Sequence, residues 1–93
     1  MIFTVVWKPS AEHSLAEMWL EHKAGRSALS DAANQIDFLL RQNPQEQGKP
    51  YIGQARTLLV LPLGVLFRVF ESDRLVRILA AWYIPSYTTN GVA

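Results

Sequence analysis

Arginines in two neighbouring apolar runs are the residues of this chain whose type and spacing best suit chemistry, namely the binding of an anion. Arg68 lies in the run 65–70 and Arg77 in the run 75–82, and Ser72-Asp73 separates the two. Apolar and β-branched runs between such turn residues predict consecutive antiparallel strands. A two-residue Ser-Asp loop would place Arg68 directly opposite Arg77, whereas a three-residue Ser-Asp-Arg loop would separate them.

Like charges directly opposite each other on a sheet repel, so the first register needs a physical reason. Two reasons remain open. The pair could hold an anion between its guanidinium groups. Alternatively, the arginine stems could cover apolar surface while their charged ends extend into water.

A second turn predicts a third arginine on the same face. The segment Pro62-Leu63-Gly64 fits a three-residue hairpin loop, in which Pro opens a type I turn and Gly takes the left-handed bulge position. That loop would pair Leu58 with Arg68 and Arg56 with Phe70. Three arginines would then project from one face: Arg56, Arg68 and Arg77.

These registers divide the side chains of the last two strands into an uncharged face and an arginine-bearing face. The uncharged face is expected to carry Val65, Phe67, Val69, Val76, Ile78, Ala80 and Trp82. The arginine-bearing face is expected to carry Leu66, Arg68, Phe70, Leu75, Arg77, Leu79, Ala81 and Tyr83.

Length and composition predict one small globular domain over residues 1–93. The chain is 49% hydrophobic and 18% charged, with a net charge of +1, which excludes a disordered chain and gives no overall sign of nucleic-acid binding. The absence of cysteine excludes disulfides and zinc–thiolate sites. The N-terminal run lacks signal-peptide features, and no run approaches the roughly 18 apolar residues of a membrane span. We therefore expect a cytoplasmic protein with no membrane partner.

Two helices are predicted between a buried N-terminal strand, 2–7, and a polar loop, 43–54. The first spans about Ser10 to Lys23, with Ser10 as its N-cap. The second begins at Ser27 or Ser30 and ends before Asn43-Pro44. The short connection predicts an antiparallel helical hairpin. The apolar stripes of the helices are Ala11, Leu15, Met18, Trp19 and His22, then Leu29, Ala32, Ala33, Ile36, Leu39 and Leu40.

The polar loop and the C-terminal tail offer few candidate residues. Lys49 and Tyr51 could bind a ligand from the loop, although an ordinary connector is the alternative. Residues 84–93 are expected to fray after the last strand. His13 and His22 fall on opposite sides of the first helix, so they cannot share a metal ion.

The predicted element order is β-α-α-β-β-β, which favours a two-layer α+β domain with the helical hairpin packed on one face of an antiparallel sheet. Leu15, Trp19, Ile36 and Leu39 are expected to pack on Phe67, Val69, Ile78 and Trp82. The arginine-bearing face is left uncovered by the helices. Its apolar residues indicate a surface for a partner, with Leu66, Phe70 and Leu79 as its candidate contacts.

The predicted order of elements, together with several segments of the sequence, resembles the RelE/ParE toxins of bacterial type II toxin–antitoxin modules. The similar segments are Ala11-x3-Leu15-x3-Trp19, Ile36-x2-Leu39 before Asn43-Pro44, Gly53-x-Ala-Arg56-x-Leu58, Pro62 to Val69, and Asp73 to Leu79. The Leu-Phe-Arg-Val segment at 66–69, before an acidic turn, is the most specific of them. The resemblance covers nearly the whole chain.

The resemblance implies a growth-arresting toxin whose partner is a cognate antitoxin protein, and no metal or organic cofactor. Some members cleave messenger RNA on the ribosome, whereas ParE-type members inhibit DNA gyrase. A relative that only binds its antitoxin is a further alternative. In cleaving members an arginine that matches Arg68 contacts the reacting phosphate, so the resemblance favours a ribosome-dependent mRNA endonuclease, with the gyrase inhibitor and the inactive relative as alternatives.

Cleavage by attack of a 2′-hydroxyl would need a base, a proton donor and positive charge at the phosphate. Under that hypothesis the catalytic candidates are Arg68, Arg77 and Tyr83. The candidates for binding RNA or another target are Arg56, Lys49 and Tyr87, whose phenol could stack on a base.

Overall fold

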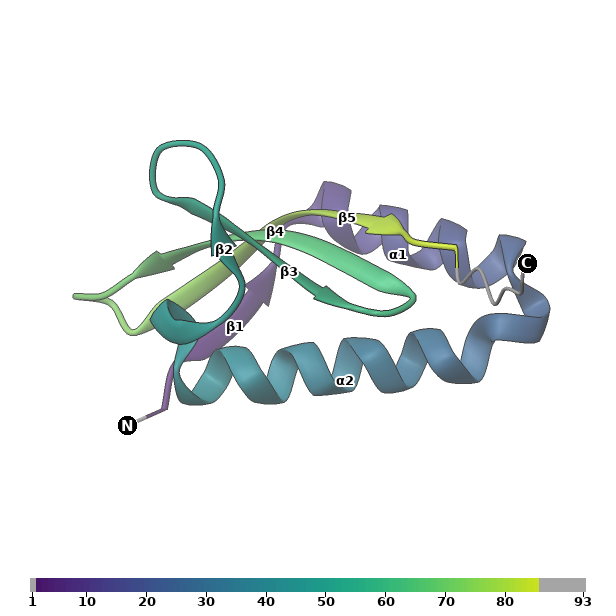
Figure 1. Ribbon diagram of the computed structural model, residues 1–93, viewed down its shortest axis with the longest axis horizontal. Coiled ribbons are helices and arrows are strands. Elements are labelled where there is room, and N and C mark those ends of the chain that lie inside the picture. The colour runs from purple at the N-terminus through teal and green to yellow at the C-terminus, as the bar shows by residue number, and fades with distance from the viewer. Residues whose placement is uncertain (1, 86–93) are drawn as a thin grey trace, which may run out of the picture.

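The computed structural model describes residues 2–85, which form two helices and one five-stranded sheet (Figure 1). The order of elements differs from the prediction by one additional short strand in the polar loop. The elements are β1 (Thr4–Trp7), α1 (Pro9–Glu21), α2 (Arg26–Gln42), β2 (Lys49–Pro50), β3 (Ala55–Val60), β4 (Leu63–Phe70) and β5 (Leu75–Tyr83), with 3₁₀ turns at Lys23–Gly25 and Pro44–Glu46.

The sheet is mixed, with the strand order β1-β5-β4-β3-β2. The ladders from β2 to β5 are antiparallel as expected, but β1 lies parallel to β5 at the edge of the sheet. Val6 of β1 pairs with Arg77 and lies on the face of the sheet that no helix covers, so its side chain is exposed. The prediction of a buried strand over residues 2–7 was wrong in this respect, although Phe3 just before β1 is buried.

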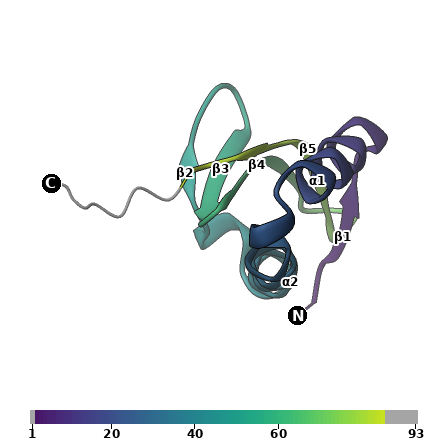
Figure 2. The same cartoon turned by 90° about the vertical axis from the view of Figure 1, so that its right-hand side faces the viewer.

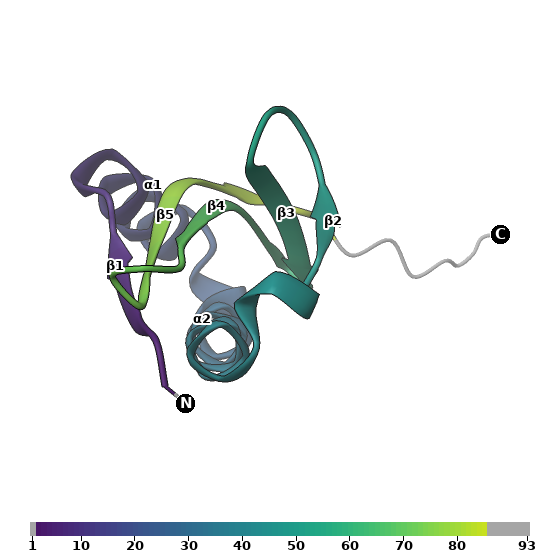
Figure 3. The same ribbon diagram turned by 90° about the vertical axis from the view of Figure 1, so that its left-hand side faces the viewer.

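The α+β, two-layer architecture is confirmed. Helix α2 crosses beneath the sheet and contacts β1, β3 and β4, whereas α1 runs in the opposite direction and packs along β5 (Figures 2 and 3). Both helices leave the other face of the sheet open. We call this surface the open face.

Both helices begin earlier than the sequence predicts. The N-cap of α1 is Lys8, with Pro9 in the first turn, where its missing N–H costs nothing. The N-cap of α2 is Gly25, so neither Ser27 nor Ser30 caps it. None of the helices in the described part of the chain is long and apolar enough to cross a membrane.

The hydrophobic core lies between α2 and the sheet and includes most of the predicted residues. Ile36, Phe67 and Ile78 are fully buried, while Leu15, Leu39 and Val69 are partly buried against them. The two predicted tryptophans are the exceptions, because Trp19 is 42% exposed and Trp82 is 38% exposed.

The turn between β4 and β5 contains an even number of residues, as the predicted register requires, but residues 71–74 form it and not Ser72-Asp73 alone. The Arg74 N–H donates to the Glu71 carbonyl at 3.1 Å, and Phe70 pairs with Leu75. Arg68 therefore lies opposite Arg77, as expected.

The turn between β3 and β4 is shorter than predicted. Leu61 and Pro62 alone form it, with a cis peptide bond between them, and Val60 pairs with Leu63. Leu63 and Gly64 thus belong to β4 and not to the loop. The ladder shifts by an odd number of residues, so Arg56 pairs with Phe67 and not with Phe70.

A β-bulge interrupts the pairing of β4 with β5. Phe67 pairs with Ile78 and Leu66 with Ala80, so Leu79 is an extra residue on β5. Because side chains alternate between faces, one extra residue exchanges the faces of all later residues in the strand. Trp82 therefore lies on the open face, opposite Gly64, and Tyr83 lies on the helix face, opposite Leu63.

Packing at the centre of the core should respond to the loss of a single methyl group. We expect Ile36→Val to lower the free energy of unfolding by about 0.5–1.5 kcal/mol, because Ile36 is fully buried. The matched change Ile52→Val, at a residue that is 67% exposed, should stay within about 0.5 kcal/mol. Urea denaturation of both variants measures the difference, and equal losses would contradict the assigned core.

Candidate functional site

The open face carries two arginines that converge on one aromatic ring. Arg68 and Arg77 are both exposed, and their guanidinium carbons lie 4.7 Å and 5.7 Å from the centroid of Phe70. The negative face of the ring attracts both cations and offsets part of their mutual repulsion. We call this group the arginine pair.

One contact orients the first of these arginines. Nη2 of Arg68 donates to Oε1 of Gln54 at 2.7 Å, from the loop that precedes β3. A guanidinium has five N–H donors, so Arg68 keeps donors for a further acceptor. The arginine pair can therefore hold a carboxylate or a phosphate.

Arg56 does not lie beside Arg68 and Arg77, so the prediction that three arginines share one face of the sheet is wrong. Arg56 shares the helix side of the sheet with its partner Phe67 and is partly buried. Its Nε donates to the Gln47 carbonyl at 2.9 Å and its Nη2 to the Gly48 carbonyl at 3.2 Å. These bonds give Arg56 a structural role in holding the polar loop against β3.

Tyr83 is also separated from the arginine pair, because the bulge turns it to the helix face. Its ring stacks on His22 at the end of α1, with 3.7 Å between the centroids and 6° between the planes. The prediction that Tyr83 shares a face with Arg68 and Arg77 was therefore wrong. Tyr83 joins the end of β5 to the end of α1.

Trp82 takes the place on the open face that was predicted for Tyr83. Gly64 lies beneath it, and a Cβ added to Gly64 would come within 2.6 Å of the indole. The missing side chain thus lets the indole lie across β4. A glycine inside a strand often marks a bulge or such a close approach, which was the available signal.

A small hollow of about 220 Å³ opens on the open face beside this indole. Tyr51, Thr57, Leu66 and Trp82 line it. The sequence singled out Tyr51 and Leu66 as candidates, but it missed Thr57 and Trp82. Leu66 and Arg68 are two residues apart on β4, so the hollow lies next to the arginine pair.

The remaining candidate residues lie at separate places in the chain. Lys49 is exposed on β2 opposite Thr57, and Phe70 is half-buried on the open face. Leu79 is half-buried at the bulge. Tyr87 and most of the predicted tail lie outside the described residues, while the Ile84 N–H donates to the Pro62 carbonyl at 2.7 Å.

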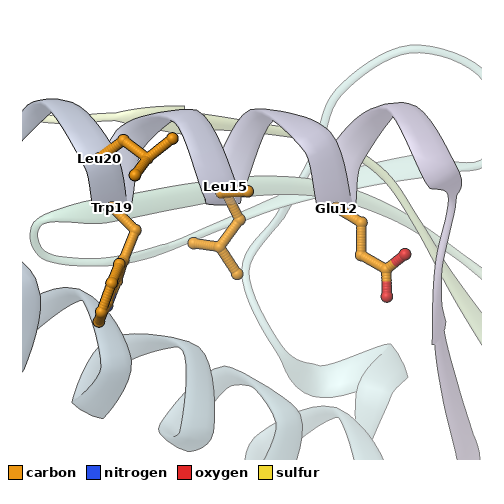
Figure 4. A pocket seen from close by; sticks show the side chains of 5 residues that line it. Glu12, Leu15, Trp19 and Leu20 are labelled. Atoms are coloured by element: carbon orange, nitrogen blue, oxygen red, sulfur yellow. The ribbon is translucent and has the colours of Figure 1, made fainter.

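A second apolar hollow, of about 420 Å³, lies on α1 (Figure 4). Glu12, Leu15, Ala16, Trp19 and Leu20 line it. Trp19 is held at the surface and not in the core, because its indole N–H donates to Ser30 Oγ at 3.3 Å and the Arg26 guanidinium lies 4.1 Å from its ring centroid.

The chemistry available on the open face is mainly that of binding. The strands β1, β3, β4 and β5 contain no histidine, aspartate, glutamate or lysine. Within residues 2–85, no three His, Asp or Glu side chains gather closely enough to hold a metal ion. The arginine pair can neutralise an anion, but these strands provide no general base beside it.

Comparisons with known proteins identify the fold. No family model matches the sequence, and no curated protein matches it either. The structure is similar to a chain of the RelBE2 toxin–antitoxin complex from Mycobacterium tuberculosis, with a TM-score of 0.72 and 20% identity over 89% of this chain and 92% of that one. It is also similar to a chain of the chromosomal ParDE toxin–antitoxin system from P. aeruginosa, with a TM-score of 0.74 and 20% identity over 90% of this chain and 98% of that one. The RelE/ParE-like fold expected from the sequence is therefore confirmed.

The bonds of Arg56 predict a measurable effect on the polar loop. In Arg56→Met the Gln47 and Gly48 carbonyls lose their donor, so amides of the β2–β3 ladder should exchange with solvent about tenfold faster, or ~1.4 kcal/mol. Arg77→Met is the control, because Arg77 contacts Phe70 and not this loop. Hydrogen exchange read by mass spectrometry makes the comparison, and equal rates in the two variants would contradict the assigned role.

The contact between Gly64 and Trp82 gives a second prediction. A Cβ at Gly64 must displace the indole, so Gly64→Ala should shift the Trp82 indole N–H resonance strongly. Gly25→Ala is the matched control, since the nearest atom to its added Cβ is 3.7 Å away. A ¹H–¹⁵N spectrum of each variant tests this, and an unmoved Trp82 signal in Gly64→Ala would show that the indole lies elsewhere.

Proposed function

We propose that this chain is the toxin of a type II toxin–antitoxin module, which arrests growth and is neutralised by a cognate antitoxin protein. One observation carries the proposal. A sheet face left open by the protein's own helices presents a paired cationic site beside an apolar hollow. The likeness to chains from two toxin–antitoxin systems, over about nine-tenths of this chain, supports it.

For its mode of action, we favour binding to a protein target over cleavage of RNA. A ParE-type toxin, which inhibits DNA gyrase without nuclease activity, needs only a complementary surface. The open face supports this choice, because Arg56 and Tyr83 lie on its other side. What remains is an arginine pair that can bind a carboxylate as readily as a phosphate.

A ribosome-dependent mRNA endonuclease is the second candidate, and the exposed guanidinium of Arg68 favours it. Arg68 keeps free donors and has a second cation, Arg77, directly opposite. Such a pair could stabilise the charge that develops on a phosphate during attack by a 2′-hydroxyl. The base and the proton donor would have to come from residues outside the strands, or from the ribosome.

Arg68 provides the test between these functions. Inducible expression of the wild-type chain in bacteria should arrest growth, and Arg68→Ala should relieve the arrest without unfolding the protein, because the side chain is exposed. If the chain cleaves RNA, message cleavage should fall by about 10²–10³-fold. Arg68→Lys should recover only part of the effect, because lysine lacks the bidentate donors of arginine.

The control is Arg41→Ala, which removes the same charge from α2. Arg41 forms an exposed ion pair with Asp37 at 2.7 Å, so its loss should affect neither growth arrest nor folding strongly. Primer extension on cellular messages and a supercoiling assay with purified gyrase identify the target. Normal growth on expression of a folded wild-type chain would contradict the toxin proposal and leave a protein that only binds its antitoxin.

A further inference from the structure

The hollow beside Trp82 is built by several elements of the fold. The bulge at Leu79 brings Trp82 to the open face, and Gly64 provides the space beneath its indole. The loop after β2 places Tyr51 across from it. Three separate features of the backbone thus converge on one apolar recess of about 220 Å³.

We propose that this hollow and the arginine pair form one binding site for an extended, acidic segment of a protein partner. The hollow receives an aromatic or branched aliphatic side chain of the segment, and the arginine pair binds a carboxylate next to it. This inference rests on the proposed toxin function, because it specifies the kind of protein segment that the open face recognises.

The size and lining of the hollow support a single side chain as its occupant. Pockets for small molecules typically measure about 300–1,000 Å³, and this hollow is smaller. Its walls are the two aromatic rings of Tyr51 and Trp82 and the aliphatic Leu66, with the hydroxyl of Thr57 as the one short polar group. Aromatic walls of this kind are common where a partner inserts an apolar anchor.

The spacing between the hollow and the arginine pair favours an extended segment. Leu66 lines the hollow, and Arg68 follows two residues later on the same face, a separation of about 6.6 Å along a strand. An extended partner has the same period, so its acidic residue would lie two positions from its apolar anchor. Guanidinium groups bind carboxylates in bidentate fashion.

Charge also favours an acidic segment of protein over nucleic acid. The strands β1, β3, β4 and β5 contribute no acidic side chain, so nothing on them opposes a carboxylate. Nucleic-acid affinity grows with the number of phosphates neutralised, and the sheet offers three cations on the open face, Arg68, Arg77 and Lys49, in a chain whose net charge is +1. Three contacts are few for a nucleic acid but sufficient for a short acidic segment.

Titration of short peptides into the ¹⁵N-labelled full chain tests the proposal. The probe is Ac-Asp-Ser-Phe-Ser-Asp-NH₂, in which the acidic residues lie two positions from the anchor. It should shift the Trp82 indole N–H and the Thr57 amide. Ac-Asp-Ser-Ala-Ser-Asp-NH₂ and Ac-Lys-Ser-Phe-Ser-Lys-NH₂ should each bind about tenfold or more weakly, because one lacks the anchor and the other the charge.

Two loop variants supply a matched pair. Tyr51→Ala removes one wall of the hollow and should weaken the acidic phenylalanine peptide about tenfold. Ile52→Ala should leave its affinity unchanged, because Ile52 is equally exposed on the same loop but does not line the hollow. Both residues project into solvent, at 63% and 67% exposure, so neither change should disturb folding.

Several outcomes would overturn the proposal. These are an absence of Trp82 shifts at millimolar peptide, equal affinity for the phenylalanine and alanine peptides, and tighter binding of pentauridylate than of the acidic peptide. If the chain arrests growth but fails these titrations, the proposal of an acidic partner segment is contradicted and the proposed toxin function stands. If the chain binds the peptide specifically but causes no growth arrest, the proposed binding site stands and the proposed toxin function is contradicted.

Discussion

The register of the β3–β4–β5 ladders is the constraint on which the rest of this structure depends. Side chains alternate between the two faces of a sheet, so each ladder decides which residues enter the core and which reach solvent. Three local features set that register here: the turn between β4 and β5, the turn at Leu61–Pro62 and the bulge at Leu79. The first places Arg68 opposite Arg77 on the open face, the second places Arg56 on the helix face, and the third brings Trp82 to the open face.

The same constraint separates structural from functional roles among residues of similar chemistry. Arg56 and Arg68 lie on neighbouring strands, yet one holds the polar loop and the other presents its donors to solvent. Tyr83 and Trp82 are adjacent in sequence, yet one stacks on His22 and the other forms the wall of a hollow. In each case one residue of register decides the role, since the residue types alone allow either.

The candidate site exists because the helices leave one face of the sheet uncovered. Helix α2 packs against the core face and α1 follows β5 (Figures 2 and 3). The opposite face keeps exposed arginines beside apolar groups. Burial of Phe67, Ile36 and Ile78 on one side provides the rigid support for that surface. A rigid sheet is a suitable platform for recognition because its side chains are held at fixed spacing.

The sequence by itself determined the fold class, both helices, the antiparallel ladders and the solvent-facing side of Arg68 and of Arg77. It could do so because each of these arginines stands between apolar residues, in Phe67-Arg68-Val69 and Val76-Arg77-Ile78, and the charge marks which side faces water. The sequence left two registers open for this pair, and the turn between β4 and β5 selects the one in which they lie opposite each other. Only the tertiary structure decided the parallel edge strand and the faces of Arg56, Trp82 and Tyr83. The segments Leu58 to Leu61 and Leu79 to Tyr83 are apolar or aromatic at every position, so alternation fits both registers equally well. Hydrogen bonding across the ladders and the space above Gly64 select between them.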